Sequence, residues 1–159
     1  MMTHSNPDHP LPDEVASRGY AGDIDPPLAW EVLSKEKDAV LVDVRTSAEW
    51  NFVGLSDLSS IGKRPVTIEL LSLPSMSRNP DFDQQVKEAL AQLHAGTESA
   101  VLFICRSGAR SRDAAISLTR QGFKRCYNIA GGFEGDLDAD RHRAGRNGWK
   151  FFGLPWQQS

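Results

Sequence analysis

The chain has 159 residues, 40% of them hydrophobic and 25% charged, which is the size and composition of one ordinary globular domain. A formal net charge of -3, the lack of an apolar run near 18 residues and a start without a secretion signal argue against nucleic-acid and membrane partners and predict a cytoplasmic protein. Two cysteines without metal-ligand spacing argue against a disulfide framework and a metal centre, so we expect neither metal nor cofactor.

The first half of the chain predicts an arm, a helix and two strands. Residues 1–19 are polar, contain prolines and lack periodicity, which is typical of a loose arm ahead of a single domain at 20–159. Asp25, followed by two prolines, indicates the start of a short helix. The apolar, β-branched run 39–44 predicts a strand buried on both faces of a parallel sheet, and 65–71 predicts a weaker strand inside an insertion around 54–80.

In the second half, helices and strands alternate. A helix is predicted over 81–96, with Asp81 as its cap and Gly96 as its left-handed stop. A strand at 100–104, a helix at 111–121 and a short strand at 126–129 follow. This alternation predicts an α/β domain with a mostly parallel central sheet of four to five strands and helices on both faces.

Cys105 directly follows the strand at 100–104, and Arg110 directly precedes the helix at 111–121. The turn between these two elements therefore lies at the carboxyl edge of the sheet, where open parallel sheets bind ligands. Inward-pointing N–H groups, the helix dipole and two arginines would favour negative charge on the sulfur, and Gly108 lets the turn curl tightly. The alternative is a small buried cysteine at a strand end, but a loop of this composition has no packing rationale. We therefore expect a reactive thiol.

Several segments of the sequence resemble the rhodanese family. Residues 105–111, Cys-Arg-Ser-Gly-Ala-Arg-Ser, resemble its active-site loop, and 41–45 together with Glu49 and Trp50 resemble its amino-terminal signature. Residues 128–132 resemble the strand and turn before its last helix, and the segments 148–150 and 153–156 resemble the tail of bacterial single-domain members. The resemblance covers about residues 20–158 and implies a rhodanese-like fold.

The resemblance also implies a sulfurtransferase. Cys105 would attack the outer sulfur of thiosulfate or a related persulfide donor and hold that sulfur as a persulfide. A thiol, a cyanide-like acceptor or a protein acceptor would then remove it. Catalysis would fall to Cys105, and the donor would be bound by Arg106, Ser107, Gly108, Ala109, Arg110 and Ser111.

The charged residues around the loop have different implied roles. Arg110 would hold the anionic group of the donor, the alternative being a solvated or helix-pairing arginine. Arg106 would brace the loop by pairing with Glu49. Asp43 and Arg45 would give structural support, because a carboxylate at a buried strand end needs a partner.

The remaining polar groups leave alternatives open. Ser107 and Ser111 could hydrogen-bond the sulfur or cap the helix, and capping is the more economical interpretation for Ser111. Cys126 begins its strand whereas Cys105 follows one running parallel, so several residues of about 3.3 Å each separate their levels and no disulfide can join them. We predict a buried, inert Cys126.

Two features lie outside the core pattern. The loop after the weak strand could form a pocket wall in which Met76 and Arg78 touch a substrate, or it could be a plain surface loop. The tail aromatics are expected to pack on the domain, and any exposed remainder would indicate a partner contact; these are Trp149, Phe151, Phe152 and Trp156.

Two rival functions remain open. A cysteine-dependent phosphatase or arsenate reductase would have an arginine six positions after its cysteine, where this chain has Ser111, so the ring here is one residue smaller. A noncatalytic rhodanese-like interaction module would usually lack the cysteine, which is intact here.

Overall fold

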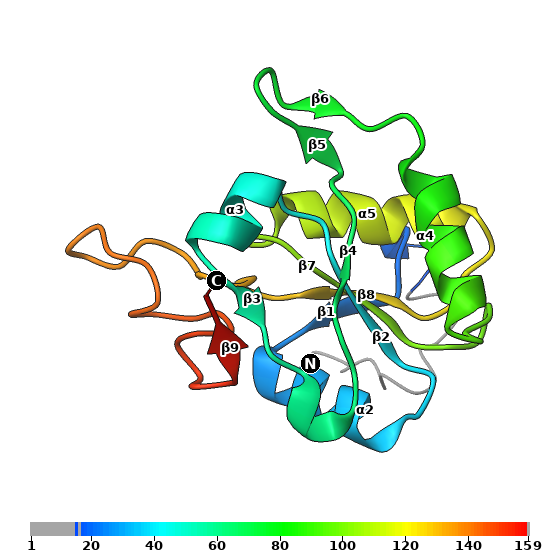
Figure 1. The fold of residues 1–159 in the computed structure, drawn as a ribbon, viewed down its shortest axis with the longest axis horizontal. Coiled ribbons are helices and arrows are strands. Elements are labelled where there is room, and N and C mark those ends of the chain that lie inside the picture. The colour runs from blue at the N-terminus through cyan, green and yellow to red at the C-terminus, as the bar shows by residue number, and fades with distance from the viewer. Residues whose placement is uncertain (1–14, 16, 159) are drawn as a thin grey trace.

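Five parallel strands form the central sheet of the structure, a computed structural model that describes residues 15 and 17–158. The strand order is β1-β8-β7-β2-β4, which confirms the predicted α/β class with its mostly parallel sheet. Figure 1 labels the five strands and the helices around them. The strands are β1 (Gly22–Ile24), β2 (Val40–Asp43), β4 (Val66–Thr67), β7 (Val101–Ile104) and β8 (Cys126–Ile129).

Helices cover both faces of the sheet, as predicted. Helices α4 (Phe82–Gln92) and α5 (Ala109–Arg120) pack on the face that includes Val42 and Phe103. Helix α2 (Pro26–Lys35) and the carboxyl-terminal segment pack on the face that includes Leu41 and Leu102. Because successive side chains of a strand point to opposite faces, both cores need continuous apolar strands, and β2 and β7 are buried along their whole length.

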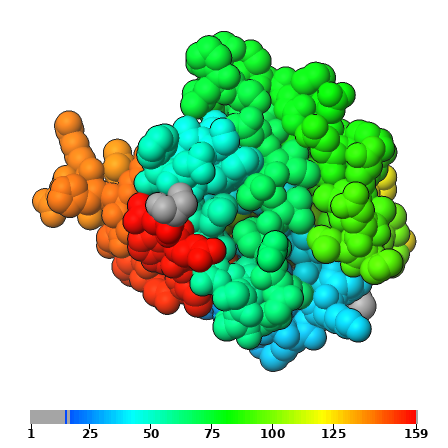
Figure 2. Space-filling model, viewed as in Figure 1, coloured from blue at the N-terminus to red at the C-terminus, as the bar shows by residue number. Residues whose placement is uncertain are grey.

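The 54–80 segment consists of several short elements rather than one. Strand β3 (Leu55–Ser56) pairs antiparallel with β9 (Trp156–Gln157), and a 3₁₀ helix, η1 (Ser59–Ile61), leads to β4. A hairpin of β5 (Leu71–Ser72) and β6 (Ser77–Arg78) follows and projects from the body of the protein (Figure 1). Figure 2 shows the carboxyl-terminal residues, in red, lying against the segment that carries β3.

Three predicted boundaries are wrong. The strand expected at 65–71 is reduced to Val66 and Thr67, the two residues in register with β2. Two further backbone hydrogen bonds, from Ile68 N to the Asp43 carbonyl and from Leu70 N to the Val44 carbonyl, follow before the chain enters the hairpin at Leu71. The helix expected to stop at Gly96 ends at Gln92, where His94 adopts the left-handed conformation (φ 59°) and Ala95 N donates to the Leu90 carbonyl, a Schellman stop. The helix expected from Ser111 already begins at Ala109.

Two elements near the start of the domain were not predicted: β1, and helix α3 (Ser47–Phe52). The arm predicted over 1–19 lies largely outside the described residues; at its described end, Val15, Ser17 and Arg18 are helical. Within the described part of the chain, no helix has both the length and the apolar character needed to cross a membrane.

Candidate active site

Cys105 lies at the carboxyl end of β7, in the middle of the sheet, and its exposed fraction is 1%. The chain reverses at Gly108, whose positive φ of 125° suits glycine and makes it the N-cap residue of α5. The backbone N–H of Gly108 therefore points back into the loop and donates to Cys105 Sγ at 3.1 Å. The sulfur is buried, but a main-chain donor faces it.

The other residues of the loop differ in their exposure to solvent. Arg106 and Ala109 are exposed, whereas Ser107 and Arg110 are partly buried. Ala109 and Arg110 belong to the first turn of α5 and not to the loop, so the loop between strand and helix is shorter than predicted.

Ser111 faces the sulfur rather than capping the helix. Its Oγ lies 3.1 Å from Cys105 Sγ and donates to Oδ1 of Asn128, a residue of β8. Asn128 in turn donates from Nδ2 to Asp23 on β1 at 2.9 Å. The capping role preferred for Ser111 is therefore wrong, because Gly108 occupies the N-cap and Ser111 is one turn further on.

Glu49 pairs with Arg110 and not with Arg106, which corrects the predicted brace of the loop. Arg110 donates from Nη1 and Nη2 to the two carboxylate oxygens of Glu49, at 2.7 and 3.0 Å. Burial would raise the pKa of Glu49, but hydrogen bonds from Arg110 and from the Thr46 backbone lower it to about 2. Burial would lower the pKa of Arg110, yet the negative groups around it, chiefly Glu49 and also Cys105, raise it.

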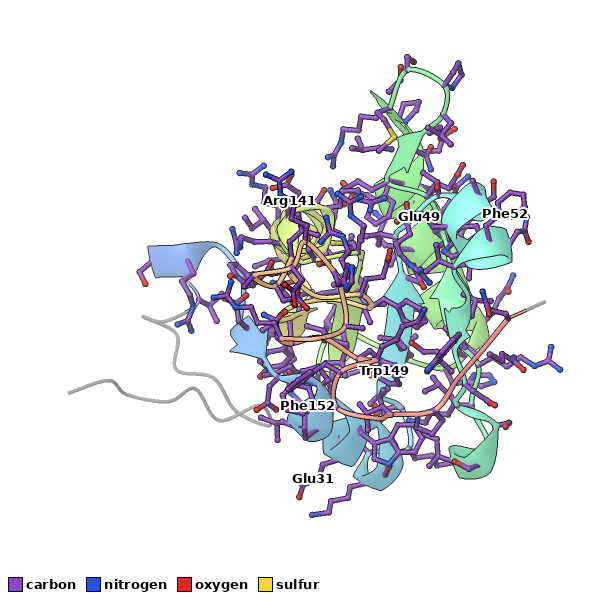
Figure 3. The ribbon with its side chains drawn as sticks, turned by 90° about the vertical axis from the view of Figure 1, so that its left-hand side faces the viewer. Glu31, Glu49, Phe52, Arg141, Trp149 and Phe152 are labelled. Atoms are coloured by element: carbon purple, nitrogen blue, oxygen red, sulfur yellow. The ribbon has the colours of Figure 1, made fainter. Side chains whose placement is uncertain are left out.

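Helix α3 presents Glu49 to the site. Thr46 and Glu49 form a reciprocal capping box, in which each side chain accepts from the other's backbone N–H. Figure 3 shows Glu49 on the side of α3 that faces the body of the protein and Phe52 pointing outward, where Phe52 is 80% exposed. The sequence pattern Thr-x-x-Glu was the available signal for this helix.

Asp43 and Arg45 form a fully buried ion pair beside the site. Asp43 is in register with Ile104, the residue before Cys105, and its Oδ2 accepts from Arg45 Nη2 at 2.7 Å. Arg45 also donates to the Gly54 carbonyl, and its guanidinium lies 4.3 Å from the ring centre of Phe133. The structural role implied for this pair stays a prediction, and the geometry agrees with it.

The segment after β8 holds the backbone of the loop. Phe133 N donates to the Cys105 carbonyl at 2.8 Å, and Glu134 N donates to the Arg106 carbonyl at 3.0 Å. Gly132 packs so closely here that an added Cβ would lie 2.5 Å from the Cys105 carbonyl oxygen. Glycine is therefore needed for this close approach.

Cys126 is far from the candidate site. It is in register with Val101 at the start of β7, whereas Cys105 lies four residues further on, which corresponds to about 13 Å along a strand. Both cysteines are free thiols, and burial raises the pKa of Cys126 to about 12. These features agree with a buried, inert Cys126.

The hairpin and the tail contribute little to the sulfur's surroundings. Arg78 donates to Ser117, about 9 Å along α5 from Ser111, and Met76 is partly exposed. The tail packs on the domain through Trp149, which is fully buried against Trp30. The other tail aromatics keep exposed fractions of 40–45%; they are Phe151, Phe152 and Trp156.

Two polar residues near the sulfur were missed from the sequence: Asp23 and Asn128. Asn128 is a buried polar residue in a strand that is otherwise apolar or aromatic, and this was a usable signal. Within residues 15 and 17–158, no group of three His, Cys, Asp or Glu side chains could hold a metal ion.

A comparison with family models matches residues 26–139 to the model described as rhodanese-like domain. Among curated proteins, an uncharacterized protein of Rickettsia rickettsii, the RP600 homolog, is 39% identical over 81% of this chain and 91% of its own length. The thiosulfate sulfurtransferase GlpE of Glaesserella parasuis is 31% identical over 71% of this chain and 83% of its own length.

Among solved structures, Rv0390 from M. tuberculosis is similar to most of this chain. Its sequence identity is 46% and its TM-score is 0.76, with 88% of this chain and 99% of that one covered.

Proposed function

The chain belongs to the rhodanese-like domain family, and from this premise we propose that it is a sulfurtransferase that carries sulfane sulfur on Cys105. The observation that carries the proposal is the Gly108 N–H, which is aimed at Cys105 Sγ from 3.1 Å. A thiolate and a persulfide are both anionic near this position, so a fixed main-chain donor stabilises either form without rearrangement.

The proposed reaction has two displacement steps. In the first, the Cys105 thiolate attacks the outer sulfur of the donor; a new S–S bond forms, the donor's S–S bond breaks, and sulfite or a thiolate leaves with the electron pair. In the second, an acceptor thiolate or cyanide attacks the outer sulfur of the persulfide, and Cys105 leaves as the thiolate. Neither step needs a metal or a redox cofactor.

Arg110 is proposed to attract the anionic donor. Its two bonds to Glu49 leave other N–H groups of the guanidinium for a ligand. The Glu49 carboxylate also lowers the net positive charge around Arg110. A donor of low charge, such as a persulfide, should therefore bind at least as well as the dianion thiosulfate. The reducing cytoplasm, where two free thiols persist, is the proposed setting.

Intact-mass measurement tests the proposal. Incubation with thiosulfate or with glutathione persulfide should add one sulfur, about 32 Da, to the protein. Cys105→Ser should abolish the adduct, whereas Cys126→Ser should retain it. An adduct that survives Cys105→Ser, or no adduct with either donor, would contradict the proposal.

A noncatalytic interaction module is the second candidate, and the 1% exposure of Cys105 favours it, because a carrier sulfur must be reached. The two functions differ in their need for the thiol. Sulfur transfer should stop after alkylation of Cys105, whereas binding of a partner by a scaffold should survive it. The phosphatase alternative would require hydrolysis of an aryl phosphate that vanadate inhibits.

A further inference from the structure

A chain of hydrogen bonds leads from the buried sulfur to the surface. Cys105 Sγ contacts Ser111 Oγ, Ser111 donates to Asn128 Oδ1, and Asn128 Nδ2 donates to Asp23 Oδ1. The same oxygen of Asp23 accepts from the hydroxyl of Tyr20 at 2.8 Å. Ser111 and Asn128 are buried, whereas Asp23 is exposed. The proposed sulfur transfer does not use the outer part of this chain.

The donor and acceptor groups of these residues fix the direction of each hydrogen bond. A carboxylate only accepts hydrogen bonds, so Asp23 keeps the Nδ2 side of Asn128 toward itself. Oδ1 of Asn128 must then face Ser111, and a carbonyl oxygen also only accepts. The single hydroxyl proton of Ser111 therefore points to Asn128, whose Oδ1 is closer to Ser111 Oγ than its other acceptor, the Gly108 carbonyl at 3.2 Å. Ser111 can thus offer only a lone pair to the sulfur, and a lone pair suits an S–H group but opposes a thiolate.

We propose that Asp23 and Asn128 are positioning residues that hold the Ser111 hydroxyl proton away from Cys105 Sγ, so that Ser111 presents a lone pair to the sulfur. In that state the sulfur accepts from Gly108 N and donates its own proton to Ser111 Oγ, so both of its contacts are satisfied. The importance of this arrangement for catalysis rests on the proposed sulfurtransferase function, although the arrangement itself does not.

Activation then requires Ser111 to turn. When a base in solution takes the Cys105 proton, the Ser111 hydroxyl must leave Asn128 Oδ1 and donate to the thiolate. A half-turn of the Asn128 amide would help, because Nδ2 would then face Ser111, but it would set Oδ1 against the Asp23 carboxylate. Asp23 therefore opposes the thiolate through the orientation it imposes on Asn128, in addition to any effect of its charge.

Other charged groups face the two ends of the chain. Arg110 lies within electrostatic range of Cys105 and of Asp43, and it is paired with Glu49. At the outer end, burial and then the hydrogen bond to Asp23 raise the pKa of Tyr20, while Arg112 acts in the opposite sense. These groups are kept in every variant proposed below. Asn128→Leu changes no charge, whereas Asn128→Asp adds one and Asp23→Asn removes one, so the Ser111→Ala background and the Asp113→Asn control are needed to separate charge from the orientation of the Ser111 hydroxyl.

Two substitutions of Asn128 should act in opposite senses. The measurement is the rate of Cys105 alkylation by iodoacetamide against pH, followed by mass spectrometry of the Cys105 peptide. In this reaction the thiolate displaces iodide, a C–S bond replaces the C–I bond, and the thiol proton passes to the buffer. Because the sulfur is buried, its limited access lowers the rate at every pH, so the midpoint of the pH profile is compared and not the rate itself.

Asn128→Leu removes the closer acceptor, so that the Ser111 hydroxyl is left to choose between the Gly108 carbonyl at 3.2 Å and the sulfur at 3.1 Å, and a thiolate is the stronger acceptor of the two. The midpoint should move toward acid by about one pH unit, because one added hydrogen bond to a charged atom changes such an equilibrium about tenfold. Asn128→Asp keeps an acceptor facing Ser111, so its midpoint should stay in place or move toward alkali. A purely structural role would shift both variants alike, and that outcome would overturn the proposal.

The shift should also depend on Ser111 and respond to Asp23. In a Ser111→Ala background, Asn128→Leu should cause no further shift. Asp23→Asn should move the midpoint toward acid by more than Asp113→Asn, a control that removes the same charge from the exposed face of α5. This second route keeps the proposal testable if Asn128→Leu fails to fold, and equal shifts in the two aspartate variants would contradict it.

The alkylation profile and the sulfur adduct separate the two proposals. A profile that shifts as described in a protein that takes up no sulfur would leave the hydrogen-bond chain intact and refute the sulfurtransferase. A sulfur adduct with no shift in any variant would do the reverse.

Discussion

Gly132 lies against the carbonyl of Cys105, so that a Cβ atom on Gly132 would come within 2.5 Å of that oxygen. Gly132→Ala should therefore push the loop away from its support and lower the free energy of unfolding by about 2–5 kcal/mol, the sum of a left-handed conformation and overpacking. Urea denaturation measures the loss, and sulfur loading should fall with it.

Gly62→Ala is the matched control for that substitution. Gly62 has a similar positive φ, 71° against 61°, but nothing lies within 4 Å of an added Cβ. Its cost should be limited to the backbone conformation, about 1–2 kcal/mol, with sulfur loading unchanged. Equal losses in the two variants would show that the contact with Cys105 is unimportant.

The Glu49–Arg110 pair should make stability depend on pH in the acid range. The folded-state pKa of Glu49, about 2, lies below its ordinary value of 4.5, so the pair stabilises the fold above about pH 4.5 and loses that contribution as the pH falls toward 2. Glu49→Gln should lack this component. Urea denaturation at about pH 6 and about pH 3 should show a smaller difference in the variant than in the parent.

Arg110→Gln is expected to flatten the same part of the pH profile only partly, because it removes the Arg110 hydrogen bonds that depress the Glu49 pKa and leaves those from Thr46. A profile for either variant that parallels the parent's would mean that the pair is not the source of the acid sensitivity.

The buried pair of Asp43 and Arg45 should be costly to break from one side. Asp43→Asn leaves the Arg45 cation without its counter-charge at 0% exposure, and we expect a loss of about 3–5 kcal/mol by urea denaturation. The double variant Asp43→Asn with Arg45→Met should lose less than the single substitution, since no unpaired charge remains.

A surface pair provides the reference for this loss. Lys124 Nζ and Glu98 Oε1 lie at a similar distance, 2.8 Å, but the two side chains are 68% and 72% exposed. Glu98→Gln should be indistinguishable from the parent protein. A comparable loss at both sites would argue that burial does not decide the energy of the Asp43–Arg45 pair.

Cys126 should resist alkylation as long as the protein is folded. With its pKa raised to about 12 by burial, only about one thiol in ten thousand would be ionised near pH 8. Iodoacetamide should label Cys105 alone in the native protein and both cysteines in urea, as read by peptide mass spectrometry. Native labelling of Cys126 at the rate of Cys105 would refute its inert role.

The central sheet could be predicted from the sequence because its two central strands are continuous apolar runs. Residues 39–44 and 100–104 contain few polar side chains, and a run of this kind suits only a strand with apolar neighbours on both faces. The position of Cys105 at the carboxyl end of the sheet could be predicted from the end of the run 100–104. Strand β1 was missed because three residues, Gly22–Ile24, are too few to show a period.

The partners of the loop were harder to predict, because they depend on contacts between distant segments. Glu49 and Arg110 are 61 residues apart, and which arginine of the loop meets Glu49 depends on where α5 begins. The positive φ of Gly108 starts that helix two residues early, turns Arg110 toward α3 and brings Ser111 to the sulfur. No local pattern in the sequence encodes that choice.

The hydrogen bonds from Phe133 and Glu134 to the loop carbonyls also fix when the site can form during synthesis. Cys105 leaves the ribosome well before these two residues do, so a nascent chain has its thiol before it has the backbone that shapes the loop. A chain that ends before Phe133 therefore lacks both of these hydrogen bonds, and the loop that carries Cys105 gains this backbone support only after β8 and the residues behind it have been made.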